Sequence, residues 1–441
     1  MNTDKDSKLT TTNLKEQIAS ESRFVPYSML SLLGKENIKE VQLGDQTETE
    51  LTILFADIRN FTQLSETMTP KENFDFINSY LNRMEAVITS HGGIIDKYLG
   101  DGIMAIFPTW PDSAVNCSIT MLKQLEKFNK EIKTKGLPAT KIGIGLNTGL
   151  CMLGTIGGPG RMECTVISDA VNLAARLETL TKNYQVNLLI GENTFNSLQD
   201  SRMFSVRFID RVLVKGKTQP QSIYEVYDTD SYKSKCLKTK TKPIFEEALA
   251  HYHYKEIDSA KLLLEMCLKI NPEDKPAQVY LQRCNLYLEK DIFEGSQELM
   301  QQIVWSKEFE VGNPEIDSQH FDLFKNSVKL LNSVNIDVSK EDINKLIAYI
   351  YEYTNTHFST EENYLKENNY PFIERQKRQH RNFTKSFKIL KEEIDSNTKS
   401  KTYNMFRIQI LLIDWIVNHV LKEDQHFGKY INEKLEKKSL S

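Results

Sequence analysis

The sequence predicts an α+β protein of several domains, and three observations lead to that class. Residues 50–228 alternate strand-like and helix-like runs that begin in the order βαββαβ. From Thr229 to Lys242 lysines cluster and apolar residues thin out, which is typical of a linker. From about residue 301 apolar residues recur almost wholly at helical spacing. A length of 441 residues has room for two to four such domains.

The chain should start with an entry segment, residues 1–49, that is partly disordered because its first part is polar. The α+β domain then opens with a strand that ends at Asp57. Thr69-Pro70-Lys71-Glu72 is a capping box with proline at the first helical position, so it starts a helix, which should run to Ser90.

A hairpin follows, built from residues 93–99 and 103–107 around the turn Gly100-Asp101-Gly102. A second helix should run from Asp112 to about Lys133, and two separate strands, 141–147 and 150–156, come next. This order predicts a sheet with antiparallel pairs that helices cover on one face.

Residues 229–300 should form the linker and a short helical spacer. Ala248, Ala260, Leu264 and Pro272 recur as in one tetratricopeptide unit. Because about three repeats are needed for independent stability, we expect a spacer packed on its neighbours rather than a peptide-binding array.

Composition excludes several classes of protein. A formal net charge of −4 gives no general attraction for nucleic acid or anionic lipid, so neither partner is expected. Six scattered cysteines without a C-x-x-C pair favour reduced thiols. With no apolar run long enough to cross a membrane and no leader-like start, the expected location is the cytoplasm.

Two aspartates in the first domain suggest a metal site. Asp57 and Asp101 each follow an apolar strand-like run and sit where the strand gives way to a turn. Paired carboxylates at one sheet edge can hold two divalent ions over a triphosphate. A turn aspartate without a ligand is the alternative, above all for Asp101 between two glycines.

The motifs Phe55-Ala56-Asp57-Ile58-Arg59 and Lys97-Tyr98-Leu99-Gly100-Asp101-Gly102, the run from Thr165 to Glu178, and Val214-Lys215-Gly216-Lys217 occur together. With them, residues 50–228 resemble the class III nucleotidyl cyclase catalytic domain, whose fold is a ferredoxin-like palm. The resemblance implies two Mg²⁺ or Mn²⁺ ions per active site, held at Asp57, Ile58 and Asp101. Asn60 and Ser168 depart from it, since glycine is usual at both positions.

The resemblance implies further roles that the chemistry also asks for. Attack of a ribose 3′-hydroxyl on the α-phosphorus builds negative charge that the planar guanidinium of Arg176 can stabilise. Asn172, one helical turn earlier, can orient the ribose, and Lys215 can contact the terminal phosphates. A solvated helix face is the alternative for a lone Asn–Arg pair.

Base choice follows from hydrogen-bond polarity. Lys97 and Thr165 suit adenine, whereas guanylate cyclases of the family carry glutamate and cysteine there, so ATP is the expected substrate. Lys97 lies four residues before Asp101 on one strand, a poor geometry for serving the base and the metals of one nucleotide. The family resemblance implies that two subunits share each site, so a homodimer is required for activity.

Four of the eight histidines fall at the ends of apolar helical stripes in residues 301–436. Imidazoles and carboxylates inside a bundle are costly unless they bind something, and this mixture of nitrogen and oxygen donors suggests two irons. Trp305, His320, His357-Phe358-Ser359-Thr360-Glu361, His380, and His419 with Asp424 resemble a bacterial hemerythrin domain, an all-α four-helix bundle.

That resemblance implies that His320 and His357 serve one iron and His380 and His419 the other, with Glu361 and Asp424 as bridges. Gln376 stands where the family has a third histidine on the second iron. The resemblance also implies dioxygen as a ligand of such a centre.

Together these observations predict an adenylate cyclase, a phosphorus–oxygen lyase that makes 3′,5′-cyclic AMP and pyrophosphate by a two-metal mechanism, regulated by oxygen or redox state through the diiron domain. One alternative is a guanylate cyclase. Another is a catalytically weak cyclase-fold protein that mainly senses oxygen or iron.

Overall fold

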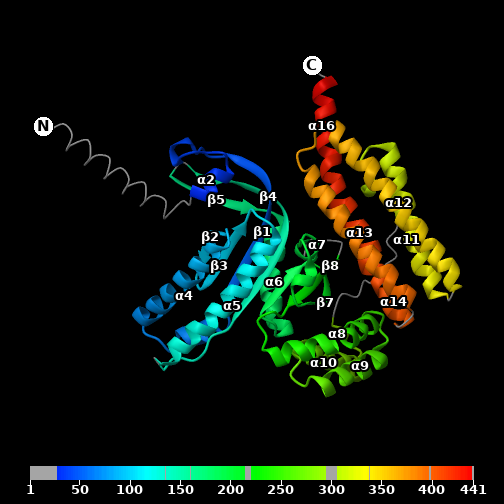
Figure 1. The fold of residues 1–441 in the computed structure, drawn as a ribbon. Coiled ribbons are helices and arrows are strands. Elements are labelled where there is room, and N and C mark those ends of the chain that lie inside the picture. The colour runs from blue at the N-terminus through cyan, green and yellow to red at the C-terminus, as the bar shows by residue number, and fades with distance from the viewer. Residues whose placement is uncertain are drawn as a thin grey trace. The chain divides into compact units, whose positions relative to one another are not determined.

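The computed structural model describes residues 27–134, 136–158, 160–213, 220–294, 305–336, 338–396 and 399–439 (Figure 1). Lys215 and the rest of the segment 214–219 lie outside these residues. The chain divides into two compact units. The first runs to Phe204 and includes Val226–Thr229, and the second comprises Ser205–Glu225 and the chain from Asp230 onward.

The first unit is built on a sheet in the order β2-β3-β1-β4-β6, with β5 paired to β4. Its strands are β1 (Gln46–Ile58), β2 (Ile94–Leu99), β3 (Gly102–Phe107), β4 (Ile142–Gly158), β5 (Arg161–Ile167) and β6 (Leu188–Gly191). The pairs β2–β3, β3–β1, β1–β4 and β4–β5 are antiparallel, and β4 pairs with β6 in parallel.

The two strands expected at 141–147 and 150–156 are one strand, β4. It pairs with the whole of β1, from Gln46 opposite Gly154 to Ile58 opposite Ile142. Thr148 and Gly149, where the break between two strands was expected, pair with Thr52 and Leu51 inside this ladder, so the strand continues through them.

The helices of the first unit are α2 (Tyr27–Leu32), η1 (Ile38–Glu40), α3 (Phe61–Ser65), α4 (Pro70–Ser90), α5 (Pro111–Thr134), α6 (Asp169–Tyr184), α7 (Glu192–Asn196) and η2 (Ser201–Met203). The capping box is confirmed. Thr69 N–H donates to Glu72 Oε2 at 2.8 Å, and Glu72 N–H donates to Thr69 Oγ1 at 3.3 Å.

Helices cover both faces of the sheet, so the expectation of one covered face was wrong. A Cβ added to Gly93 would meet Ile88 of α4 and Phe107, which pairs with Thr52 of β1. A Cβ added to Gly145, which pairs with Phe55 of β1, would meet the backbone of α6. Residues 52 and 55 point to opposite faces because side chains alternate along a strand.

The second unit begins with neighbouring strands β7 (Val206–Leu213) and β8 (Pro220–Val226, its last residue in the first unit). The spacer helices α8 (Tyr232–His253), α9 (Ile257–Ile270) and α10 (Lys275–Lys290) follow. The lysine-rich stretch expected as a linker is therefore helical. Lys238 is buried and donates to Glu225 Oε1 of β8 at 2.7 Å, a contact that the charge pattern alone does not reveal.

The spacer packs on the β7–β8 hairpin through buried polar contacts. Arg207 donates to both carboxylate oxygens of Asp274 at 2.7 and 2.8 Å, and Tyr280 Oη donates to the carbonyl of Ile209 at 3.0 Å. His253, the last residue of α8, is buried against Phe406 with ring centroids 5.5 Å apart.

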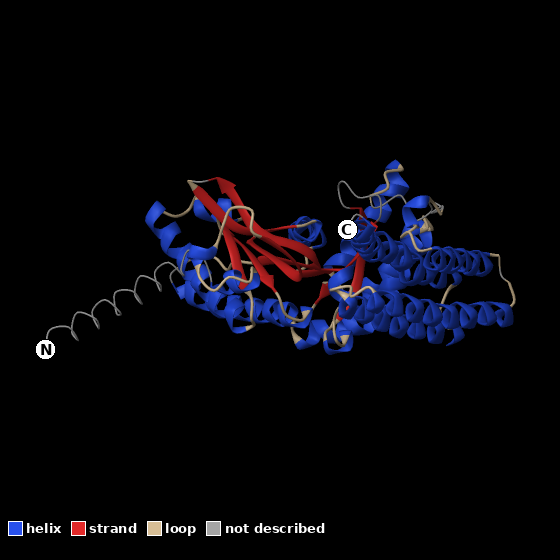
Figure 2. Ribbon diagram, turned by 90° about the horizontal axis from the view of Figure 1, so that it is seen from above, coloured by secondary structure: helices blue, strands red, loops and turns tan. Residues whose placement is uncertain are grey.

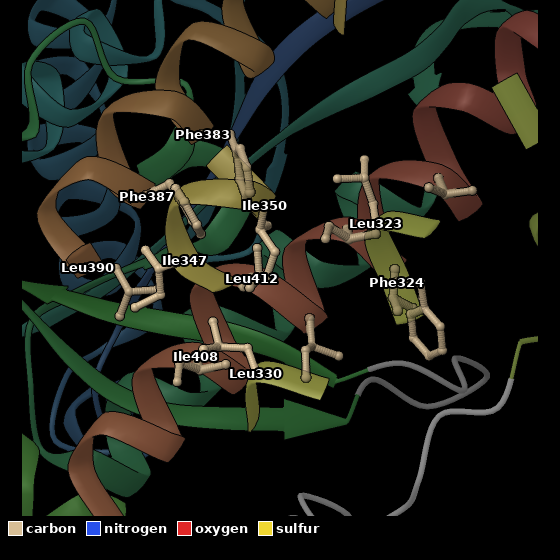
Figure 3. Packing of buried hydrophobic residues seen from close by; sticks show 14 of the residues in the cluster. Leu323, Phe324, Leu330, Ile347, Ile350, Phe383, Phe387, Leu390, Ile408 and Leu412 are labelled. Atoms are coloured by element: carbon tan, nitrogen blue, oxygen red, sulfur yellow. The ribbon is translucent and has the colours of Figure 1, made fainter. Parts of the chain in front are cut away.

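The rest of the second unit is helical (Figure 2): η3 (Lys307–Phe309), α11 (Pro314–Asn335), α12 (Lys340–Glu367), α13 (Ile373–Ser396), α14 (Lys401–Ile408), η4 (Gln409–Asp414), α15 (Trp415–His419), η5 (Val420–Asp424) and α16 (Gln425–Ser439). The segments η4 and η5 are π-helical. Leu323, Ile350, Phe387 and Leu412, from four successive parts of the bundle, meet in one apolar core (Figure 3). In the described part of the chain, no helix has the combined length and apolar character that a membrane span needs.

Candidate active site and candidate metal centre

Asp57 and Asp101 meet at one end of the first unit's sheet. Ala56 pairs with Ile103, so Asp57 comes beside the Gly102 turn, where an added Cβ would lie 3.2 Å from Asp57 Oδ1. Burial, followed by the charge of Asp57, raises the pKa of Asp101 to about 6. A cation beside the pair would offset the charge repulsion that Asp101 meets, and the hard oxygens of two carboxylates suit Mg²⁺ or Mn²⁺.

A third carboxylate lies near this pair. Burial and the charge of Asp57 raise the pKa of Glu178 on α6 to about 7, although Arg59 opposes the shift. The helix lies directly on the sheet, because a Cβ added to Gly145 would come within 2.2 Å of the backbone nitrogen of Glu178. The sequence offered Glu178 only as the last residue of a motif.

The two departures from glycine fit their places in the fold. Asn60 has φ of 57°, the left-handed region that asparagine tolerates better than most residues. Ser168 has φ of −171°, which is ordinary extended backbone, and its hydroxyl accepts from Ala170 N–H at 3.0 Å to cap α6. Serine therefore introduces no strain before the helix that carries Asn172 and Arg176.

Lys97 and Thr165 come together between β2 and β5. Lys97 Nζ donates to Glu163 Oε1 at 2.5 Å, and Thr165 Oγ1 donates to Asp96 Oδ2 at 3.0 Å. Lys97 Nζ also lies 3.5 Å from Asp96 Oδ2. These four side chains form the β2–β5 polar cluster, of which the sequence reading had identified only the lysine and the threonine.

Asn172 is exposed and Arg176 half-buried, one turn apart on α6. Among the residues that the structure describes, neither side chain makes a hydrogen bond or an ion pair with Asp57, Asp101 or the β2–β5 polar cluster. The structure thus gathers the site residues of the first unit into separate groups.

The six expected iron ligands and Gln376 lie together inside the bundle, and all seven are at most 4% exposed. Nε2 of His380 lies 3.2 Å from Oε2 of Glu361, and Nε2 of His357 lies 3.7 Å from the same oxygen. The carboxylate of Asp424 approaches Nε2 of His320 at 3.1 Å and Nε2 of His419 at 3.2 Å.

Burial and the neighbouring charges shift the pKa values of the side chains in this cluster in opposite directions. Although burial opposes a proton on His380, the carboxylates of Glu361 and Glu362 raise its pKa to about 9. Burial, with nearby His380, lowers the pKa of His419 to about 3 even though Asp424 opposes that shift. Burial and the charge of Asp424 raise the pKa of Glu361 to about 7.

The donor set fits metal ions. Within the described residues, Oε2 of Glu361 and Oδ2 of Asp424 are buried without a hydrogen-bond partner, and both face imidazole nitrogens. Two groups of ligand atoms, Glu361 with His380 and His419, and Glu361 with His320 and Asp424, each lie within 4.8 Å of one another. Nitrogen and oxygen donors in this mixture suit iron.

Three side chains that the sequence analysis did not assign orient the imidazoles. Nδ1 of His357 lies 3.1 Å from Gln319 Oε1, Nδ1 of His419 lies 2.9 Å from Gln379 Oε1, and Nδ1 of His380 lies 2.9 Å from Glu362 Oε1. Such partners fix the ring so that Nε2 faces the ligand site. The sequence does contain a signal for these three residues, because each is a polar residue directly beside an expected ligand in the same helix.

Gln376 lies inside the cluster. Its Nε2 donates to Asp424 Oδ1 at 2.6 Å and to Glu361 Oε1 at 3.1 Å. The amide therefore links the two expected bridging carboxylates in the place where a histidine ligand would stand. His426, in contrast, contacts Tyr370 Oη through Nδ1 at 2.7 Å and belongs to no ligand group among the described residues.

The π-helical segment η5 explains how His419 and Asp424 share one site. They lie five positions apart in the sequence, and in an α-helix that step turns about 140° around the axis. A π turn bonds residue i to i+5 and so aligns residues five apart. The same holds in η4, where Gln409 Nε2 donates to Asp414 Oδ1 at 2.7 Å.

Comparison with protein families identifies both halves. Residues 43–227 match the adenylate and guanylate cyclase catalytic domain, and residues 313–431 match the hemerythrin HHE cation-binding domain. The chain joins a nucleotidyl cyclase domain to a hemerythrin domain. The cyclase match includes the β7–β8 hairpin, which packs in the second unit.

This cyclase–hemerythrin chain is 44% identical over 219 residues to an adenylate cyclase of Anabaena cylindrica, covering 48% of this chain and 44% of the relative. It is 38% identical over 269 residues to the terminal-differentiation specific adenylate cyclase of Dictyostelium discoideum, covering 60% of this chain but 13% of that one. The chain thus spans less than half the length of these curated relatives.

Among solved structures, the adenylyl cyclase CyaB from P. aeruginosa is 32% identical, with a TM-score of 0.38, and the match covers 42% of this chain and 96% of that one. The hemerythrin HHE name describes cation binding, which agrees with the buried ligand cluster.

Proposed function

We propose that this protein is an adenylate cyclase that converts ATP to cyclic AMP and pyrophosphate. The observation that carries the proposal is the β2–β5 polar cluster, in which Lys97 and the hydroxyl of Thr165 can form hydrogen bonds with an adenine base. The 44% identity to an adenylate cyclase supports it. Two divalent ions, held by Asp57, Asp101 and the backbone of Ile58, would favour the attacking oxygen and neutralise the phosphates.

The chain's own residues supply the remaining functions. Arg176 would stabilise charge on the α-phosphoryl oxygens, Asn172 would orient the ribose, and Lys215 would contact the terminal phosphates. Thr165 and Lys97 would hold the base. Such a cyclase needs ATP at hand, so we also propose that it works in the cytoplasm.

We propose that each active site is shared by two copies of the chain. Apolar side chains that are 38–59% exposed follow the β4–β5 ribbon and the end of β2: Tyr98, Leu99, Met152, Ile156, Met162 and Ile167. A patch of this kind fits a second copy, because a two-fold interface buries the same surface on both chains. Lys97 and the metal aspartates of one nucleotide can then come from different chains.

Mixed dimers test this arrangement. Asp57→Ala and Asn172→Ala should each abolish cyclic AMP synthesis from ATP and Mn²⁺. Mixed after reversible dissociation, they should regain about a quarter of wild-type activity, because about half of the dimers are mixed and each has one intact site. Inactive wild-type protein would refute the cyclase assignment, and unrestored mixtures would refute the shared site.

We propose that the hemerythrin domain regulates the cyclase. When bound, two irons would supply a centre that changes redox state or takes up dioxygen. A small apolar cavity lined by Phe358, Phe383 and Trp415 adjoins the imidazoles, which suits a small uncharged ligand. Gln376 gives the second iron one nitrogen ligand fewer than an intact histidine set would.

The β7–β8 hairpin is the proposed route of this regulation. Within the second unit, Arg211 of β7 donates to both oxygens of Asp414 at 2.7 Å. Gln221 of β8 donates to Asn418 Oδ1 at 2.9 Å, and Asn418 immediately precedes His419. The chain between these strands contains Lys215.

Activity of the iron-loaded protein should therefore differ between air and dithionite. His357→Ala should remove that difference while cyclic AMP synthesis persists. Equal rates in air and dithionite for the wild type would contradict regulation by the iron centre.

A further inference from the structure

The β2–β5 polar cluster contains a buried carboxylate that the proposed chemistry does not use. The side chain of Asp96 is 0% exposed, yet its neighbours Lys97 and Glu163 are 30% and 46% exposed. A carboxylate out of water is costly unless it is paired. Asp96 therefore has to be explained by what it holds.

A β-bulge brings Asp96 into the cluster. Ile95 pairs with Ala105 and Lys97 with Met104, so Asp96 is an extra residue without an opposite partner in β3. Successive side chains of a regular strand point to opposite faces, but here Asp96 contacts Thr165 while Lys97 contacts Glu163. Since residues 163 and 165 share one face of β5, the bulge turns both consecutive side chains toward that face.

Asp96 fixes the polarity of the Thr165 hydroxyl. The hydroxyl has one proton, and Asp96 Oδ2 accepts it at 3.0 Å. The lone pairs of Oγ1 are left for a ligand, so Thr165 presents an acceptor. Adenine offers an amino donor at this edge of the base, whereas guanine offers a carbonyl oxygen that would face those lone pairs.

Asp96 also shapes the donors of Lys97. An ammonium group has three N–H donors. Glu163 takes one at 2.5 Å and Asp96 lies 3.5 Å from the nitrogen, which leaves a donor for the acceptor N1 of adenine. Guanine carries a hydrogen at N1 and cannot accept there.

We propose that Asp96 is a positioning residue that sets the preference for ATP over GTP by orienting the Thr165 hydroxyl as an acceptor and steadying Lys97. This inference rests on the proposed cyclase activity and deepens it.

The test compares kcat/KM for ATP and for GTP in Asp96→Asn. The asparagine amide can donate to Oγ1 of Thr165, which frees the hydroxyl proton for a guanine carbonyl. We expect the ATP:GTP ratio to fall by about tenfold, the scale of one buried hydrogen bond lost or gained. Turnover of ATP should fall and turnover of GTP should rise or persist.

Matched variants separate this role from structural damage. Glu163→Gln removes the other carboxylate beside Lys97 but leaves Thr165 alone, so it should lower the ratio less than Asp96→Asn does. Thr165→Val removes the hydroxyl itself, and adding Asp96→Asn to it should change the ratio no further. Thermal unfolding of each variant reports whether it folds. If Asp96→Asn does not fold, the test depends on Thr165→Val, which must by itself lower the ATP:GTP ratio of kcat/KM.

Three results would overturn the inference. They are an equal loss of both activities in Asp96→Asn, a shift in Glu163→Gln as large as that in Asp96→Asn, and an unchanged ratio in Thr165→Val. A wild type that prefers GTP or makes no cyclic nucleotide would instead refute the proposed function. The two failures are therefore distinguishable.

Discussion

Breaking the ion pair between Arg211 and Asp414 should destabilise the second unit severely. The two side chains are 2% and 4% exposed and share two hydrogen bonds of 2.7 Å. Arg211→Met leaves the Asp414 carboxylate buried beside a single amide donor, Gln409 Nε2. A buried pair that loses one partner costs about 3–5 kcal/mol, because the remaining charge stays uncompensated.

The pair itself contributes much less than that figure. Burial raises the pKa of Asp414 above its ordinary range even though Arg211 lowers it, so the cost of desolvating the carboxylate outweighs the attraction. Replacing both partners by apolar groups of similar size should therefore be close to neutral. Arg211→Met with Asp414→Leu is the corresponding double variant.

Urea denaturation of the iron-free protein, followed by circular dichroism of the helical unit, measures both effects. For a unit of this size, a loss of 3–5 kcal/mol corresponds to a fall in Tm of about 6–20 °C. Lys345→Met is a control from the same unit, because Lys345 and Glu341 are 67% and 78% exposed and such pairs contribute about 0–1 kcal/mol. A single variant that loses under 1 kcal/mol, or a double variant that loses the sum of both single losses, would refute the reasoning.

Three other predictions concern the two sites. The proposed Mg²⁺ site requires Asp101 to be deprotonated, and the pKa of Asp101 is raised to about 6, so apparent Mg²⁺ affinity should rise with pH up to about 6 and fall about tenfold per unit below it. Titration calorimetry checks this, and a flat profile from pH 5 to 7 contradicts it. Gln376→His should slow iron loss to a chelator, measured as iron per chain against Gln282→His, an exposed position on α10 outside the metal centre; equal loss from both would contradict this. Gly145→Ala should abolish cyclase activity and destabilise the first unit by about 1–3 kcal/mol, because its Cβ would lie 2.2 Å from the backbone of α6. Gly160→Ala, with open space around its Cβ, is the control, and equal behaviour would refute the packing argument.

The ends of strands and helices were the most predictable parts of this chain. The capping box at Thr69 and the turn at Gly100-Asp101-Gly102 act locally, so the sequence contains the whole signal. Asp57 and Asp101 were expected to meet because both close a strand at one edge of a sheet, and they do.

Features that depend on distant partners were missed. A regular strand would put Asp96 and Lys97 on opposite faces, and only the pairing with β3 creates the bulge that aligns them. The lysines after residue 229 resemble a linker until Glu225 is found beside Lys238. The burial of His253 also depends on a distant residue, Phe406, which lies more than a hundred residues away in the sequence.

The spacing of His419 and Asp424 could have been interpreted correctly from sequence. Two ligands five residues apart cannot share one face of an α-helix, so proposing both already implied a π turn. The π turn was missed because the fourth helix of the bundle was expected to be a regular α-helix throughout.

The π turn at η5 also constrains how this stretch of chain can change in length. An α-helix with one residue fewer between His419 and Asp424 would put them four apart, which is the α-helical equivalent of their alignment in the π turn. Phe427 and Ile431, which pack in the apolar cluster beyond the metal centre, would then keep their place in it. A single deletion in residues 420–423 can therefore be absorbed by loss of the π turn, whereas a deletion in the regular α-helix after it turns every later side chain by about 100°.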